Sequence, residues 1–250
     1  MSLIKVTNLT FAYDGSYDNI FENVSFQIDT DWKLGFTGRN GRGKTTFLHL
    51  LLGKYEYSGT ISANVGFEYF PFQGVHQESN TLDIIGDIVP DFLHWQLLRE
   101  LSLLQVSEDA VYRVFGSLSH GEQTKVLLAA LFLKENSFLL IDEPTNHLDL
   151  DGRKLVSDYL NTKSGFILVS HDRAFLDNCV DHILSINKTN IEIQKGNFSS
   201  WWENKKRQDN LELAENEKLR KDIKRLSAAA KRTLDWSENS EAKKIGFDPV

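Results

Sequence analysis

Apolar and polar residues alternate with a period of two at several places in the first 70 residues. The alternation covers residues 24–28 and returns over residues 61–65, just after the turn-forming pair Ser58-Gly59. Such alternation is typical of strands that bury one face. Between these strands, Lys33–Thr37 leads into a glycine-rich loop and then a helical segment that Gly53 is expected to end. The first quarter of the chain is therefore predicted to consist of short strands with one helix among them.

Later in the chain, two apolar runs are continuous instead of alternating. Residues 138–141 read FLLI and residues 166–169 read FILV. Strands buried on both faces of a parallel sheet have this pattern. An apolar helix is expected over Gln123–Leu133, and a hairpin over Ile183–Ile193 turns near Asn187–Asn190. These elements predict an α/β domain with a mainly parallel core sheet.

Two other stretches differ from this core. Residues 74–117 have leucines at helical spacing after a helix start at Asn80-Thr81-Leu82-Asp83, which predicts a helical insert continuing into the helix that ends near residue 133. Beyond Trp202 the sequence is rich in charged helix formers and poor in apolar residues. We therefore expect a domain over residues 1–200 and, from residue 201 to 250, a projecting charged helix that begins near Phe198.

Composition narrows the class of protein. The chain has 250 residues, of which 41% are hydrophobic and 25% charged, as in an ordinary globular protein. A single cysteine, Cys179, rules out a disulfide framework. The N-terminus does not resemble a signal peptide, and the longest apolar run, Val126–Leu133, is too short for a transmembrane helix. We expect a cytoplasmic protein without direct membrane insertion.

The C-terminal helical segment differs in charge from the rest of the chain. The formal net charge is −7, which argues against a generic nucleic-acid binder. The stretch Lys218–Arg232, however, holds seven basic residues and one acid. Such a stretch suits contact with RNA phosphates, and it equally suits a solvated helix face.

The glycine-rich loop carries the most specific chemistry. It fits the pattern G-x-x-x-x-G-K-[ST] between a predicted strand and a predicted helix. Its backbone N–H groups and the helix N-terminus are expected to bind phosphates, with Lys44 reaching the β- and γ-phosphates and Thr45 binding Mg²⁺. The expected nucleotide contacts are Gly38, Arg39, Asn40, Gly41, Arg42, Gly43, Lys44, Thr45 and the next residue, Thr46.

Acidic residues and a histidine follow the two apolar strands. Asp142 and Glu143 end the first, and His171 follows the second. Because the carboxyl ends of parallel strands meet at one edge, these side chains are expected beside the phosphate loop. Asp142 would hold Mg²⁺, Glu143 would act on the attacking water as base or positioner, and His171 would contact the γ-phosphate. The alternatives are a solvated acidic turn and a structural histidine.

The stretch Leu118–Gln123 (LSHGEQ) resembles the signature of ATP-binding-cassette (ABC) ATPases, and the order of motifs matches that family over residues 1–200. The resemblance implies an antiparallel N-terminal β part and further site residues. Tyr13 would stack on adenine, although it could simply pack. Gln73 would lie near Mg²⁺ and the attacking water. Three residues would serve a composite site with a second cassette: Ser119 and Gly121 as γ-phosphate contacts, and Asp149 as the D-loop aspartate.

Residues 142–149 (DEPTNHLD) look like the ABC-F branch, whose members carry two cassettes joined by a helical linker and act on ribosomes. The resemblance to antibiotic-resistance members implies ribosomal RNA and exit-site tRNA as partners. His120 replaces a glycine of the signature, and we expect this change to be tolerated. The chain carries one phosphate loop and one signature, so we expect the first cassette and the start of the linker.

Two other interpretations remain. The chain could be the nucleotide-binding subunit of an ABC membrane transporter, although the charged helix after the cassette is not expected there. It could also bind ATP with little hydrolysis, or form a homodimer in which Ser119 of one copy completes the site of the other.

Overall fold

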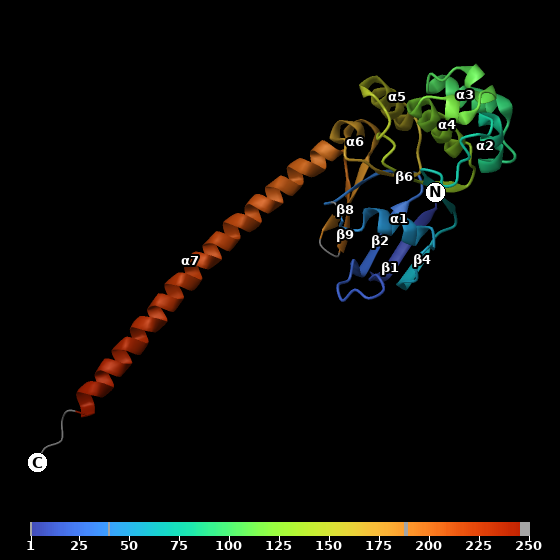
Figure 1. The fold of residues 1–250 in the computed structure, drawn as a ribbon. Coiled ribbons are helices and arrows are strands. Elements are labelled where there is room, and N and C mark those ends of the chain that lie inside the picture. Colours follow the sequence, from blue (N-terminus) through green and yellow to red (C-terminus); the bar gives the residue numbers. More distant parts are fainter. Residues whose placement is uncertain (1, 40, 188–189, 246–250) are drawn as a thin grey trace, which may run out of the picture. The chain divides into compact units, whose positions relative to one another are not determined.

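The computed structural model describes residues 2–39, 41–187 and 190–245. The chain divides into two compact units, Met1–Trp201 and Trp202–Val250. The first unit has two sheets and a group of helices, and the second consists of the continuation of the C-terminal helix (Figure 1). The prediction of an α/β fold with a mainly parallel sheet, an antiparallel N-terminal part and a C-terminal helix is confirmed.

The smaller sheet is antiparallel and has the strand order β2-β1-β4. Its strands are β1 (Leu3–Phe11), β2 (Phe21–Asp29) and β4 (Ser58–Ser62). Val24 and Ile28 are fully buried while Ser25 and Gln27 are exposed, as the period-two pattern predicts.

The larger sheet has the order β5-β6-β7-β3-β8-β9. Every pairing is parallel except that of β8 with β9, which is the predicted hairpin. The two continuous apolar runs lie in β6 and β7 and are buried along their whole length, as predicted. The strands are β3 (Lys33–Thr37), β5 (Gly66–Phe70), β6 (Ser137–Asp142), β7 (Phe166–Val169), β8 (His182–Asn187) and β9 (Asn190–Lys195).

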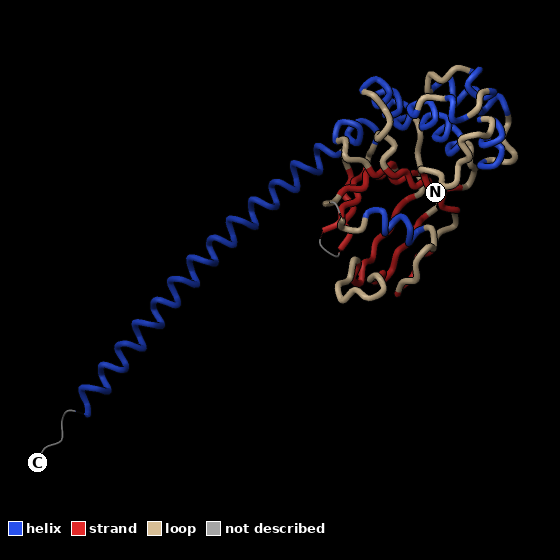
Figure 2. Tube along the Cα trace, in the orientation of Figure 1, coloured by secondary structure: helices blue, strands red, loops and turns tan. Residues whose placement is uncertain are grey.

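Most of the helices gather on one face of the larger sheet (Figure 2). They are α1 (Lys44–Leu51), α2 (Thr81–Ile88), α3 (His94–Leu103), α4 (His120–Phe132), α5 (Leu150–Asn161), α6 (Arg173–Cys179) and α7 (Phe198–Ile245), with short 3-10 turns at Glu108–Tyr112 and Phe115–Ser117. Gly53 follows α1 with φ of 68°, as its role as a stop requires.

The start of α2 differs in detail from its prediction. Asn80 occupies the N-cap, but its side chain makes no capping hydrogen bond to the helix backbone. The Asn80 amide instead donates to the Asp83 carboxylate at 3.4 Å. The backbone of Asn80 keeps the extended N-cap conformation, while its side chain contacts Asp83 instead of the helix N–H groups.

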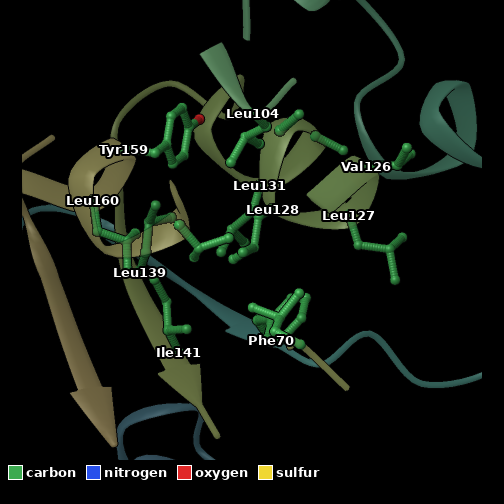
Figure 3. Packing of buried hydrophobic residues seen from close by; sticks show 14 of the residues in the cluster. Phe70, Leu104, Val126, Leu127, Leu128, Leu131, Leu139, Ile141, Tyr159 and Leu160 are labelled. Carbon is green, nitrogen blue, oxygen red and sulfur yellow. The ribbon is translucent and has the colours of Figure 1, made fainter. Parts of the chain in front are cut away.

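Two hydrophobic clusters lie on the two faces of the larger sheet, and β6 supplies residues to both. Leu139 and Ile141 pack with Leu128 and Leu131 of α4 (Figure 3). The intervening side chains of β6 pack instead against α1, which lies between the two sheets. Successive side chains of a strand point to opposite faces. The next residue in this alternation, Asp142, therefore lies on the face of the sheet that carries α1.

The C-terminal helix begins at Phe198, as expected, and Phe198 is buried in the cluster that holds α4. Beyond Trp202, the described side chains are exposed or half-buried, and apolar positions such as Leu219, Ile223 and Leu226 are more than half exposed. Within the described part of the chain, no helix has the length and apolar character that crossing a bilayer requires.

Candidate phosphate-binding site

The loop between β3 and α1 has the backbone geometry of a phosphate cradle. Gly41 and Gly43 have φ of 75° and 94°, which favour glycine. A Cβ on Gly43 would lie 2.5 Å from Ile20 Cγ2, so the position has no room for a side chain. Helix α1 begins directly after it with no side-chain cap, which leaves its N-terminal N–H groups to bind an anion. Asn40 lies outside the described residues.

Lys44 and Thr45 connect this loop to the end of β6. The Lys44 ammonium donates to the Gly38 carbonyl at 3.0 Å, across the mouth of the loop. Burial lowers the pKa of Lys44, while the charges of Glu143 and Asp142 act in the opposite direction. The Thr45 hydroxyl donates to Asp142 Oδ2 at 3.0 Å, although 97 residues separate the two. The predicted meeting of the phosphate loop with the strand carboxylate is therefore present.

Hydroxyl and carboxylate oxygens are the ligands that Mg²⁺ prefers, often through its water molecules. Thr45 Oγ1 and the Asp142 carboxylate form such a set beside a loop that can hold phosphates. The residues present therefore fit a magnesium nucleotide.

Glu143 and His171 lie together at the ends of the neighbouring strands β6 and β7. Glu143 Oε1 is 3.4 Å from His171 Nε2, and the backbone N–H of His171 donates to Oε2 at 3.4 Å. Burial raises the pKa of Glu143; His171 lowers it in part, and Asp142 adds to the rise. Oε1 is buried and accepts no hydrogen bond from the described residues. A water molecule donating to this oxygen would satisfy it, as a general base requires.

Tyr13 lies beside the helix that follows the loop. Its hydroxyl shares a hydrogen bond of 2.7 Å with Thr46 Oγ1. Its ring meets those of Phe11 and Tyr55 edge to face, with centroids 5.1 and 5.7 Å apart. Tyr13 therefore packs against other aromatic rings, as the alternative interpretation of this residue expects. The side chain is still 43% exposed, so part of the ring remains accessible to a base.

Gln73 is exposed in the loop after β5, and no hydrogen bond joins it to any residue that the structure describes. A cavity of about 320 Å³ lies nearby, and its lining includes Phe72 from the segment after β5, Thr124 of α4 and Glu143 after β6. Gln73 does not line it.

Ser119, Gly121 and Asp149 belong to a second group. Ser119 forms a capping box at the start of α4, with its backbone N–H 2.8 Å from Glu122 Oε2 and its hydroxyl accepting from the Glu122 N–H at 3.2 Å. Asp149 caps α5 by accepting from the Gly152 N–H at 2.8 Å.

The two capped helix starts lie side by side. The rings of His120 and His147 are 5.4 Å apart, and a Cβ on Gly121 would lie 3.5 Å from the His147 carbonyl oxygen. The signature and the loop before α5 thus form one exposed surface. Within the described residues, no hydrogen bond joins this surface to Lys44 or Thr45.

Sequence reasoning missed one residue at the site. The Tyr69 hydroxyl donates to Asp142 Oδ2 at 3.0 Å, the same oxygen that Thr45 contacts. The available signal was its position near the end of β5, which pairs in parallel with β6. That pairing could not be read from the hydrophobic pattern.

Comparison with known proteins agrees with the motifs. The ATP-binding protein YdiF of Bacillus subtilis is 33% identical over 216 residues, covering 84% of this chain and 34% of YdiF. The ribosome protection protein VmlR of the same organism is 33% identical over 210 residues, covering 79% of this chain and 36% of VmlR. The chain thus spans about a third of the length of these relatives.

A solved structure described as the ATP binding subunit of an ABC transporter has the same fold. It superposes with a TM-score of 0.66 at 22% identity, covering 77% of this chain and 90% of that one. The family model described as ABC transporter matches residues 21–146, from the start of β2 past the carboxylates that end β6. With the phosphate loop and the β6 carboxylates inside that match, this chain belongs to the ABC transporter family and contains its ATP-binding cassette.

Proposed function

We propose that this chain binds ATP with Mg²⁺ and hydrolyses it to ADP and phosphate. The observation that carries the proposal is the 3.0 Å contact of Thr45 with Asp142 at the mouth of the phosphate loop. The loop residues 38–46 hold the phosphates, Lys44 contacts the β- and γ-phosphates, and Tyr13 stacks on adenine. Thr45 and Asp142 would hold Mg²⁺, which would neutralise phosphate charge when bound.

In this proposal Glu143 accepts a proton from the attacking water. Two observations support the role of general base: Oε1 is buried and accepts no hydrogen bond from the described residues, and the pKa of Glu143 is raised by burial. His171 lies 3.4 Å from that carboxylate and contacts the γ-phosphate. Gln73, exposed in the loop after β5, would contact Mg²⁺ and the attacking water.

We further propose that hydrolysis needs a second cassette. Ser119, Gly121 and Asp149 lie on one exposed surface that no hydrogen bond connects to the loop of the same chain within the described residues. They would complete the ATP site of another cassette, in the same full-length protein or in a homodimer. ATP then holds two faces together, and hydrolysis releases them.

Within the family, we assign the chain to the ABC-F branch and place it in the cytoplasm. The sequence DEPTNHLD at residues 142–149 and the similarity to VmlR support this assignment. In the full-length protein, the cassette would act on the ribosome, near ribosomal RNA and exit-site tRNA, in antibiotic resistance or as a translation factor. The basic stretch Lys218–Arg232 supplies positive charge for such a contact.

The proposed ATP site is tested by Lys44→Ala. Loss of the ammonium removes a charge-assisted contact with phosphate, and we expect ATP affinity to fall by roughly tenfold or more. Binding of a fluorescent ATP analogue with Mg²⁺ measures it. Lys5→Ala, which changes an exposed lysine of β1, is the matched control and should bind ATP normally. Equal affinity of the Lys44→Ala variant would refute the site.

The proposed ribosome contact is tested by co-sedimentation. Changing Lys218, Arg220 and Lys221 to glutamine should weaken sedimentation with ribosomes and flatten its salt dependence, because fewer cations are released. The matched control changes Lys205, Lys206 and Arg207 to glutamine in the same helix. Equal loss in both variants would contradict a specific role of Lys218–Arg232.

The second candidate function is that of the nucleotide-binding subunit of a membrane transporter. The likeness of the fold to such a subunit favours it. Co-fractionation with membranes, without ribosomes, would support this candidate over the first.

A further inference from the structure

A tyrosine from the edge strand β5 contacts the carboxylate proposed to hold the metal. The Tyr69 hydroxyl and the Thr45 hydroxyl both donate to Asp142 Oδ2, each at 3.0 Å. Within the described residues, Asp142 Oδ1 accepts no hydrogen bond. Two donors on one oxygen fix the rotation of the carboxylate and leave its other oxygen available to a metal ion or its water.

The position of Tyr69 follows from the pairing of two parallel strands. Tyr69 lies opposite Leu140 in the register of β5 with β6, and Leu140 shares its face of the sheet with Asp142. Tyr69 packs against the same cluster as α1. In the sheet, β5 lies on one side of β6, and β3, the strand before the phosphate loop, lies on the other. The Tyr69 hydroxyl therefore reaches the Asp142 carboxylate from the side opposite to β3.

The ring of Tyr69 is held by two further side chains. The His49 ring of α1 lies 5.6 Å from it, and the Lys54 ammonium lies 5.5 Å from its centroid. Burial, followed by the charge of Asp142, raises the pKa of Tyr69. A donor held in this way keeps one orientation without depending on the nucleotide.

We propose that Tyr69 is a positioning residue that orients the Asp142 carboxylate for Mg²⁺ bound with the nucleotide. The proposal rests on the proposed ATP site. Donation to Oδ2 slightly lowers the basicity of the carboxylate, which opposes metal binding. Fixing its orientation favours metal binding, and in metal sites the loss of such an outer partner typically costs 10- to 100-fold in affinity. We therefore expect the gain in metal binding from the fixed orientation to exceed the loss from the lowered basicity of the carboxylate.

The test is Tyr69→Phe, which removes one oxygen atom and keeps the ring. We expect the Mg²⁺ concentration for half-maximal binding of a fluorescent ATP analogue to rise by about tenfold. Binding of the analogue in EDTA should not change, because Tyr69 contacts the carboxylate and not the phosphate loop. Direct titration with Mn²⁺ and ADP, followed by electron paramagnetic resonance, should show the same shift.

The matched control is Tyr57→Phe, which removes the same atom from a half-buried ring at the edge of the same cluster. It should leave the Mg²⁺ requirement unchanged. An unchanged or lowered requirement in Tyr69→Phe would overturn the proposal, as would a lower thermal stability with no shift in the metal titration. Failure of the unsubstituted chain to bind ATP at all would instead refute the ATP site itself.

Discussion

In the Glu143→Gln variant, ATP turnover is expected to fall by about 10²- to 10⁴-fold while ATP remains bound, because glutamine cannot accept the proton of the attacking water. The carboxylate that would do so has one buried oxygen with no donor among the described residues and lies 3.4 Å from His171. Phosphate release in single turnover, at several protein concentrations, measures the effect.

The control for this prediction is Glu135→Gln, the same substitution at an exposed position two residues before β6. It should turn over ATP normally. Turnover that is equal in Glu143→Gln and the unsubstituted chain would contradict the assignment of the base. Turnover rising with the square of protein concentration would indicate that two copies of this chain complete the site.

The pH dependence of turnover provides a separate test of the same residue. Burial raises the pKa of Glu143, and a general base works only when deprotonated. Turnover should therefore fall as pH decreases through this raised pKa, at a higher pH than for an ordinary glutamate. In the Glu143→Gln variant, the residual turnover should not show this decrease at acidic pH.

The largest expected effect on stability comes from Glu100, which is 1% exposed in α3. Its carboxylate accepts from Arg99 Nη2 at 2.8 Å, from the Tyr159 hydroxyl at 2.7 Å and from the Lys163 ammonium. These contacts join the helical insert to α5 and the residues after it. Glu100→Ala leaves Lys163 and Tyr159 without this partner, and we expect it to lower the free energy of unfolding by about 3–5 kcal/mol.

Denaturant unfolding measures this change, with Glu78→Ala at an exposed acid of the insert as control. A change below about 1 kcal/mol in Glu100→Ala would contradict the prediction. The double variant Glu100→Leu with Lys163→Met should recover part of the loss, because it removes the buried carboxylate together with its half-buried ammonium partner.

The stability supplied by Glu100 also depends on pH. Burial opposes its charge, but hydrogen bonds from Lys163, Arg99 and Tyr159 outweigh this and hold the pKa below its usual range. A depressed pKa in the folded state contributes stability above the unfolded value of about 4.3. The difference between the unsubstituted chain and Glu100→Gln should thus shrink as pH falls through the folded pKa.

Much of the fold and part of the site could be predicted because their signals are local. The glycine spacing of the phosphate loop, the capping box at Ser119 and the apolar runs of β6 and β7 each depend on residues close in sequence. The expectation that Asp142 meets Thr45 needed one further rule, that parallel strands end at a common edge.

Other contacts could not be predicted because they depend on which elements become neighbours. Tyr69 reaches Asp142 only through the register of β5 with β6. Glu100 and Lys163 are 63 residues apart, and nothing in either local pattern indicates the other. Gln73 had a role assigned by family resemblance, yet its loop leaves it exposed.

The amino-acid sequence by itself determined the turn of the phosphate loop, the end of α1, the start of α7 and the burial of β6 and β7. These properties follow from backbone sterics, capping hydrogen bonds and the removal of apolar side chains from water. Only the tertiary structure decided the strand order, which places Glu143 beside His171. It also decided that the Tyr69 hydroxyl donates to Asp142. Hydrogen bonds between strands join backbone groups that are alike in every residue but proline, so strand order arises from the packing of the whole domain.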